Sequence, residues 1–218
     1  YPLGLMLLIV GIVLAGCSKL KPVIPNSGFS TLKVVIDNNY PPFSFLDDKG
    51  NLQGILIDRW KLWERKTGNR VEITGMDWSQ AQIQMEAGAF DVIDTMFWTE
   101  TREKIYEFSD PYQNIDVPIY FNNKISGIVD TTSLKGFIVA VKANDAAIDY
   151  LHKNGVTNLI EYESYEAIIQ AAANNQVMVF VMDKPPADYF LEQYKISRNF
   201  NQTVPLYTGQ FRRAVLEG

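Results

Sequence analysis

The stretch KVVIDNNYPPFSFLDDKGNLQGILID, residues 33–58, decides how this chain folds. Its β-branched start, 33–36, is typical of a buried strand, and that strand ends at Asp37. An Asp-Asp-Lys-Gly-Asn turn at 47–51 then precedes a second apolar run that ends at Asp58. The pattern predicts a strand that delivers an acid into a loop.

That loop carries two aromatic side chains on a stiff backbone. Tyr40 and Phe43 flank Pro41-Pro42, and the rings are held in place because proline fixes the backbone angle φ. We expect Asp37 and Tyr40 to form one wall of a ligand pocket, since loops held by rigid strands often carry function. The alternative is an ordinary strand, loop and hairpin.

Composition excludes several classes of protein. The chain has 218 residues, 47% of them hydrophobic, which is enough for one or two cores. Its 25 acids and 20 bases give a net charge of −5, which argues against a nucleic-acid partner. A single cysteine, Cys17, permits no internal disulfide, and a single histidine, His152, leaves no usual zinc ligand set. We expect no metal and no cofactor, and we expect His152 to be solvated.

Residues 1–17 are predicted to be a targeting segment. They carry no charge, and the apolar run 3–14 has the length of a signal-peptide core. The run ends in Leu-Ala-Gly-Cys-Ser, which resembles the bacterial lipoprotein cleavage box, so Cys17 is the expected site of lipidation. The alternative is an uncleaved transmembrane anchor. Either one holds the folded part outside the cytoplasmic membrane, with residues 18–31 as a tether.

Beyond the tether, strand and helix patterns alternate, which is typical of an α/β fold with mostly parallel sheets. The first expected elements are strand 33–36, helix 57–66, strand 71–75, helix 79–87, strand 91–97 and a helical turn at 99–104. The second series is strand 117–121, strand 137–141, helix 145–154, strand 158–161, helix 164–174, strand 177–182 and helix 186–194. A last strand, 203–208, is expected to carry the chain back to the first unit.

The two series predict two lobes with a cleft between them. We expect lobe 1 at residues 32–116, lobe 2 at 117–203, and a return to lobe 1 at 204–218. The carboxyl ends of parallel strands face such a cleft, which is the usual place for ligands in open sheets. Candidate ligand contacts are therefore expected at strand ends.

The segment 91–112, DVIDTMFWTETREKIYEFSDPY, supplies candidate contacts from lobe 1. A strand ends there at Asp94 and Thr95, and Arg102 follows on a short helical turn. Arginine can hold a carboxylate through two parallel hydrogen bonds. The alternative is a surface arginine paired with a neighbouring glutamate.

Lobe 2 supplies an acid at the end of the apolar run 179–183. Asp183 is the last residue of that run and is followed by Lys-Pro-Pro. A carboxylate at this strand end can pair with the ammonium group of a ligand. Its alternative role, as N-cap of the following helix, does not exclude the first.

Together these segments resemble the bacterial extracellular solute-binding proteins of family 3, the amino-acid-binding type. The resemblance covers residues 32–216 and is carried by the opening 37–43, by Thr-Glu-x-Arg at 99–102 and by Phe-Ser-Asp-Pro-Tyr at 108–112. It implies the two-lobed Venus-flytrap fold of the type II periplasmic binding proteins. It also implies that Arg102 holds the α-carboxylate of the ligand and Asp183 its α-amino group. The family normally adds one more lobe 1 helix after the point where this sequence stops.

The sequence departs from the family at several contact positions. Phe97-Trp98 stands where a small hydroxyl residue is common, and Asp145 stands near a helix start where threonine is frequent. With Tyr40 and Trp78 as wall residues, the pocket is expected to be aromatic with acids at its edge. That combination favours an amine or a cationic amino acid. The alternatives are that Trp78 and Phe97 are core residues and that Asp145 is a helix cap.

The resemblance implies solute binding outside the cytoplasm. We expect a membrane-anchored component of an ABC uptake system, which presents a small polar solute to a permease. The stretches 75–82, 92–109 and 179–190 also resemble input domains fused to histidine kinases and diguanylate cyclases, so a sensing role is the alternative. An enzyme is not expected, because no Ser/His/Asp or Cys/His set occurs; dehydratase-like chemistry on the same fold is a third interpretation.

Overall fold

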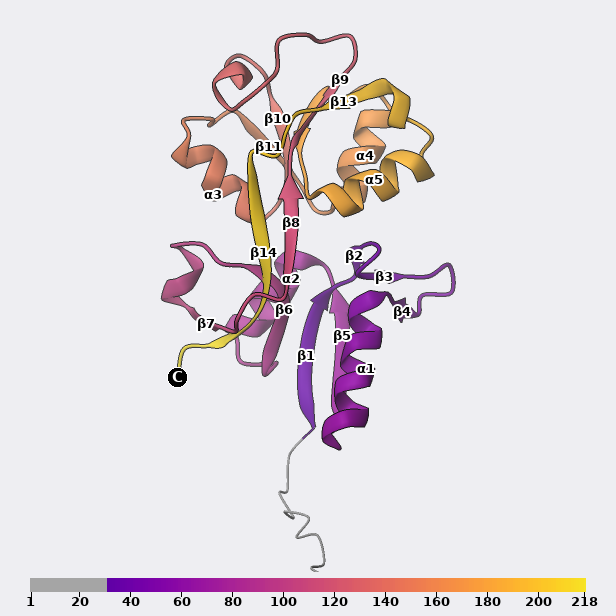
Figure 1. Cartoon of the computed structure of the whole chain (residues 1–218), viewed down its shortest axis with the longest axis vertical. Helices are drawn as coiled ribbons and strands as arrows, with labels where there is room; N and C mark the ends of the chain where they lie inside the picture. Colours follow the sequence, from indigo (N-terminus) through magenta and orange to yellow (C-terminus); the bar gives the residue numbers. More distant parts are fainter. Residues whose placement is uncertain (1–30) are drawn as a thin grey trace, which may run out of the picture.

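The computed structural model describes residues 31–218, which form two lobes built on two separate sheets (Figure 1). The predicted targeting segment with Cys17, and the predicted tether up to residue 30, lie outside the described residues. None of the helices in the described part is both long and apolar enough to cross a membrane.

Lobe 1 is built on a six-stranded sheet with the order β5-β1-β6-β14-β7, in which β8 pairs with β14. Strand β1 lies between β5 and β6 and pairs in parallel with both, as the sequence predicts. The bounds are Leu32–Asp37 (β1), Val71–Met76 (β5), Val92–Phe97 (β6), Tyr106–Phe108 (β7), Gln113–Val117 (β8) and Tyr207–Leu216 (β14).

The two faces of β1 are covered by two different helices. Val34 packs with Trp60 of α1 (Ile55–Thr67), whereas Val35 packs with Trp78 at the start of α2 (Trp78–Glu86). Successive side chains of a strand point to opposite faces, so an uninterrupted β-branched run provides apolar side chains that pack against both helices. The strand is thereby fixed in the middle of lobe 1, and its carboxyl end at Asp37 is aimed at lobe 2.

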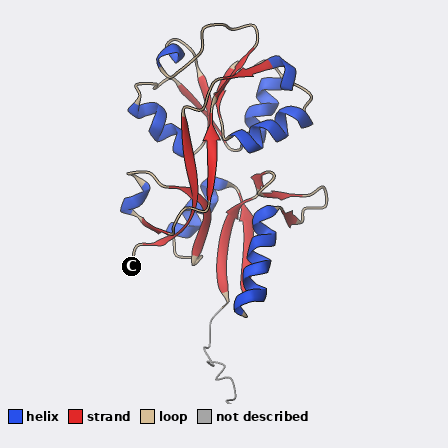
Figure 2. Cartoon of the chain, viewed as in Figure 1, coloured by secondary structure: helices blue, strands red, loops and turns tan. Residues whose placement is uncertain are grey.

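Lobe 2 is built on a five-stranded sheet with the order β11-β10-β12-β9-β13. Helices lie on both sides of this sheet (Figure 2). The strands are Ile119–Asn122 (β9), Val139–Lys142 (β10), Leu159–Tyr162 (β11), Val179–Val181 (β12) and Phe200–Gln202 (β13). The helices are Ala146–Lys153 (α3), Tyr165–Ala173 (α4) and Lys184–Gln193 (α5).

Two strands run side by side between the lobes (Figure 1). β8 leads the chain into lobe 2 and β14 brings it back, and they pair antiparallel from Tyr207 opposite Val117 to Phe211 opposite Gln113. Because the crossings are hydrogen-bonded to each other, any separation of the lobes has to bend this ribbon. The β8–β14 ribbon is therefore the expected hinge.

The predicted α/β fold with two lobes is confirmed, with local corrections. The expectation of mostly parallel sheets is wrong: in each of the two main sheets three strands pair in parallel, and the other pairings are antiparallel. The last helix, α5, begins at Lys184 rather than at 186, because Pro185 and Pro186 occupy its first turn, where a missing N–H costs nothing. The strand expected at 203–208 is wrong: β14 begins only at Tyr207. Pro205 cannot donate to a ladder and interrupts the run before that point. The lobe bounds stay a prediction.

The loop after β1 is held by a small three-stranded sheet of its own. Its strands are Asn39–Tyr40 (β2), Ser44–Leu46 (β3) and Leu52–Gln53 (β4). The carbonyl groups of Pro42 and Phe43 accept hydrogen bonds from the first two N–H groups of α1, at 3.1 and 2.9 Å. The stiff loop therefore also caps a helix, and Gly54 allows the close approach.

Replacing Gly54 with alanine should destabilise lobe 1 more than replacing Gly50 with alanine. At Gly54, φ is +125° and an added Cβ would lie 2.3 Å from the carbonyl oxygen of Phe43. At Gly50, φ is +79° and no atom lies within 4 Å of the added Cβ. We expect losses of about 1 kcal/mol for Gly50→Ala and about 3 kcal/mol or more for Gly54→Ala in chemical unfolding. Equal losses would contradict the close-contact argument.

Candidate functional site

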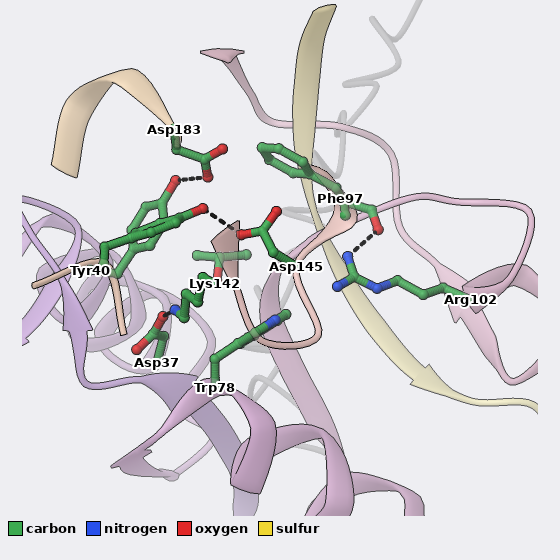
Figure 3. Close-up of a pocket in the computed structure, with 11 residues that line it drawn as sticks. Asp37, Tyr40, Trp78, Phe97, Arg102, Lys142, Asp145 and Asp183 are labelled. Carbon is green, nitrogen blue, oxygen red and sulfur yellow. Dashed lines mark hydrogen bonds and ion pairs between the residues drawn. The ribbon is translucent and has the colours of Figure 1, made fainter. Parts of the chain in front are cut away.

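A cavity between the two lobes gathers charged and aromatic side chains (Figure 3). Its volume is about 20 Å³, which is room for about one water molecule. The carboxyl ends of β1, β6 and β10 and the start of α5 all lead to it, as the strand-end rule predicts. The lining residues are Asp37, Tyr40, Trp78, Thr95, Phe97, Arg102, Lys142, Asp145, Ala146, Tyr165 and Asp183.

Every residue predicted to contact a ligand, with the exception of Asp94, lines this cavity. The structure thus brings together side chains from positions 37 to 183, which lie in both lobes. Their contact with a ligand stays a prediction.

Asp94 is the correction, because it lies in a buried network within lobe 1. Its carboxylate accepts hydrogen bonds from Trp60 Nε1 at 2.7 Å and from the Tyr112 hydroxyl at 2.5 Å. Arg213 Nε lies 3.6 Å from Asp94 Oδ2, and the Arg213 guanidinium lies over the Trp60 and Tyr112 rings. Neighbouring strand residues point to opposite faces, so Thr95 lines the cavity and Asp94 does not.

Asp183 presents a carboxylate from lobe 2 that is only half satisfied. It is 4% exposed, and Oδ2 accepts a hydrogen bond from the Tyr40 hydroxyl of lobe 1. Oδ1 is buried and accepts no hydrogen bond from the described residues. Asp183 holds the N-cap position of α5, but its side chain makes no cap hydrogen bond. The spare oxygen is therefore available to a ligand donor.

The protonation of Asp183 is set by burial. Burial, with the nearby charge of Asp145, raises the pKa of Asp183 to about 8, although the hydrogen bond from Tyr40 and the charge of Lys142 act in the opposite direction. Burial and the Asp183 charge also raise the pKa of Tyr40 well above its ordinary value, so Tyr40 stays a donor. The Asp183 carboxyl is therefore harder to ionise than an exposed carboxyl.

Arg102 reaches the cavity from a single turn of 3₁₀ helix, Arg102–Lys104. It is 8% exposed, and it donates to the carbonyl groups of Phe97 at 2.9 Å and of Asn144, in lobe 2, at 2.7 Å. The alternative of a surface arginine paired with a neighbouring glutamate is wrong, since Glu100 pairs with Lys153 instead. Burial lowers the pKa of Arg102, but a guanidinium keeps its charge.

The carbonyl group of Asn144 is a junction between the lobes. Besides Arg102, it accepts hydrogen bonds from Trp78 Nε1 at 3.2 Å and from Gln82 Nε2 at 3.3 Å. Trp78 also packs against Val35, so it is at once a core residue and a cavity residue. Three donors of lobe 1 thus converge on one acceptor of lobe 2.

Asp145 likewise has two roles. Its Oδ1 accepts the N–H of Ala147 at 2.8 Å, which confirms the helix-cap alternative, and Oδ2 accepts the Tyr165 hydroxyl. Phe97 lines the cavity while its ring packs on Phe211, 5.5 Å between centroids. Core and cavity roles coincide here because the cavity walls are the inner ends of the two lobe cores.

Three lining residues are not among those predicted from the sequence: Lys142, Ala146 and Tyr165. Lys142 is the last residue of β10, is 2% exposed, and forms an ion pair with Asp37 across the cleft. A signal existed, since Lys142 ends an apolar strand just as Asp183 follows one. Tyr165 opens α4 and carries no local signal.

The described residues include no group of three or more His, Cys, Asp or Glu side chains placed to hold a metal ion. The cavity instead combines acids, cations and rings, which suits a small organic solute with charged groups.

The sequence matches the family of bacterial extracellular solute-binding proteins, family 3, over residues 32–181. The virulence sensor protein BvgS of Bordetella pertussis is 26% identical over 165 residues, which are 75% of this chain and 13% of the sensor. A probable amino-acid ABC transporter-binding protein of Haemophilus influenzae is 30% identical over 107 residues, 49% of this chain and 42% of that protein. The chain therefore spans less than half the length of these relatives.

Solved structures support the fold independently. A histidine kinase sensor domain with similarity to periplasmic binding proteins superimposes with a TM-score of 0.81 at 21% sequence identity. The match covers 86% of this chain and 83% of that domain.

The raised pKa of Asp183 predicts a fall in stability with rising pH. Between the ordinary carboxyl pKa near 4 and about 8, the folded chain holds a proton that the unfolded chain has released. The free energy of unfolding should therefore decrease by up to about 1.4 kcal/mol per pH unit through this window and level off above it. Urea unfolding at several pH values measures the slope.

Asp183→Asn should remove this contribution to the slope, because the amide does not titrate. The control is Asp110→Asn at an exposed position, which should keep the wild-type slope. Identical slopes for wild type and Asp183→Asn would show that Asp183 is already ionised at neutral pH.

Proposed function

The chain belongs to the bacterial extracellular solute-binding proteins of family 3, and we propose that it binds a small amino-acid-like solute in the cleft between its lobes. The observation that carries this proposal is the pair formed by Arg102 and the spare buried oxygen of Asp183. They offer a cation and an acceptor that face one cavity from opposite lobes.

The solute's carboxylate is proposed to bind Arg102. In the closed structure the guanidinium uses two N–H groups on the carbonyl groups of Phe97 and Asn144. A guanidinium carries five N–H donors, so others are left for a carboxylate.

The solute's ammonium is proposed to bind Asp183. The cation would favour the ionised carboxylate, and it would place a donor on the oxygen that the described residues leave unpaired. Tyr40 would continue to orient the other oxygen.

Binding of such a solute requires motion of the lobes. An amino acid does not fit a cavity of about 20 Å³, so the lobes have to separate before it enters. Contacts from both lobes are then made together only when the lobes close around the solute, in an arrangement that leaves more room than the described one. The solute would shift an open–closed equilibrium about the β8–β14 ribbon.

We propose two roles that use this binding step outside the cytoplasm. The first is the solute-binding component of an ABC uptake system, anchored through a lipid on Cys17 or through an N-terminal helix. The Haemophilus relative and the Leu-Ala-Gly-Cys-Ser sequence at 14–18 support it. In neither role do we propose a catalytic step.

The second role is a ligand-sensing input domain of a transmembrane signalling protein. The BvgS relative supports this role, as does the set of hydrogen bonds that holds the lobes closed. A domain that is closed without a solute can signal through a small change in its closed form. An uptake component, in contrast, has to present different loaded and empty forms to its permease.

Arg102→Ala and Asp183→Ala should each weaken binding. A thermal-shift screen of amino acids, simple amines and dicarboxylates on the wild type first identifies the solute. Each variant should then lose at least about 1 kcal/mol of ligand-induced stabilisation, as expected for the loss of one charged contact. Arg65→Ala, on the exposed end of α1, is the control and should respond like wild type. Full responses of both cleft variants would refute the cleft assignment.

The coding sequence beyond Gly218 separates the two roles. A stop codon soon after one further lobe 1 helix would support uptake. An apolar span of about 20 residues followed by a kinase or cyclase sequence would support sensing.

A further inference from the structure

Lys142 is a buried cation that joins the two lobes. It ends β10 of lobe 2, and its ammonium pairs with Asp37, which ends β1 of lobe 1 (Figure 3). Both residues are 2% exposed. A buried ion pair within one lobe would stabilise that lobe alone, but this pair forms only when the lobes are together.

Three aromatic rings surround the same ammonium group. Lys142 Nζ lies 4.7 Å from the ring centroid of Tyr165, 5.8 Å from that of Trp78 and 5.9 Å from that of Tyr40. One carboxylate and several ring faces around a cation are the arrangement with which proteins recognise ammonium ligands. In this cleft, the cation belongs to the chain itself.

The space left in the cleft agrees with this arrangement. With Lys142 in place, the cavity measures about 20 Å³. Lys142 Nζ lies beside Asp37 and within 6 Å of three ring centroids, so this side chain occupies the aromatic, acidic part of the cleft. The rings and acids of the cleft favour a cation, and the Lys142 side chain supplies that cation.

We propose that Lys142 is a tethered cation that occupies an ammonium subsite formed by Asp37, Tyr40, Trp78 and Tyr165, and so closes the lobes without a solute. This inference rests on the proposed function insofar as the cleft is a solute site. It deepens that function by giving the specificity: Lys142 excludes solutes with a second cationic group, such as cationic amino acids. The selected solute has one ammonium, for Asp183, and a neutral or acidic side chain.

Lys142→Ala should open the subsite to an external amine. The alanine variant lacks three methylene groups and the ammonium, which n-propylammonium restores. Propylammonium at about 100 mM should raise the melting temperature of Lys142→Ala by about 3 °C or more and leave the wild type unchanged. n-Propanol, which has the same length and no charge, should have no such effect on the variant.

The lobes should also separate more in the variant. Without propylammonium, Lys142→Ala should have a larger radius of gyration in solution scattering than the wild type, and the amine should reduce it. Lys153→Ala, which removes an exposed cation from an ion pair with Glu100 between the lobes, is the matched control and should show neither effect.

A second variant keeps the test valid if Lys142→Ala folds poorly. Lys142→Met with Asp37→Asn removes both charges and leaves neither one buried alone, so it is expected to fold. This double variant should have a larger radius of gyration than the wild type, because the ion pair that closes the lobes is gone, and it should not respond to propylammonium, because the subsite has lost its carboxylate. Equal responses of wild type, Lys142→Ala and the double variant to the amine would overturn the proposal, as would no response from Lys142→Ala together with unchanged compactness.

The outcome is independent of the solute-binding test. Rescue by propylammonium needs Asp37 and the rings, whereas binding of the proposed solute needs Arg102 and Asp183. If Lys142→Ala is rescued but no amino acid stabilises the wild type, the ammonium subsite stands and the proposed function fails. If an amino acid binds but the amine does not rescue, the reverse holds.

Discussion

The ion pair between Lys142 and Asp37 is the interaction on which the closed arrangement of the two lobes depends. Both side chains are buried, and each comes from a different lobe. A buried charge without a partner is unfavourable by several kcal/mol. Lys142 and Asp37 can therefore both stay buried and charged only while the two lobes are in contact. The hydrogen bonds from three lobe 1 donors to the Asn144 carbonyl act in the same direction.

The parallel strands explain why these groups meet. Asp37 ends β1, Lys142 ends β10, and Asp183 follows β12, so the same topological rule brings them to one cleft. Their partners come from the starts of helices: Trp78 opens α2 and Tyr165 opens α4. The charges are thus supplied by strand ends, and the rings that surround them by helix starts.

Most charged groups of the cleft already have ion-pair or hydrogen-bond partners within the chain. Lys142, Asp37 and Asp145 all have partners among the described side chains, and Arg102 has two carbonyl partners. The Oδ1 atom of Asp183 is the exception among the carboxylate oxygens of this cleft that are buried. A solute can shift the open–closed equilibrium only through contacts that differ between the two states. In this cleft most contacts are made by the chain itself, and the spare oxygen of Asp183 is left for a solute.

Much of the architecture follows from local sequence patterns. The β-branched run before Asp37, the alternation of strands and helices, and the prolines at the start of α5 depend on neighbours in the chain, and such patterns are readable one segment at a time. The strand expected at 203–208 shows the limit, because Pro205 moves the crossing strand β14 to Tyr207.

The sequence by itself determined the two-lobed α/β fold, the strands that carry Asp37 and Thr95, and the segments after strands that carry Arg102 and Asp183. Only the tertiary structure decided which of these side chains meet. It turned Asp94 into lobe 1 and placed Lys142 and Tyr165 in the cleft. The physical reason is that the two-residue period of a strand fixes the alternation of its side chains but not which face borders the cleft. An ion pair between residues 105 positions apart also leaves no pattern in the local sequence.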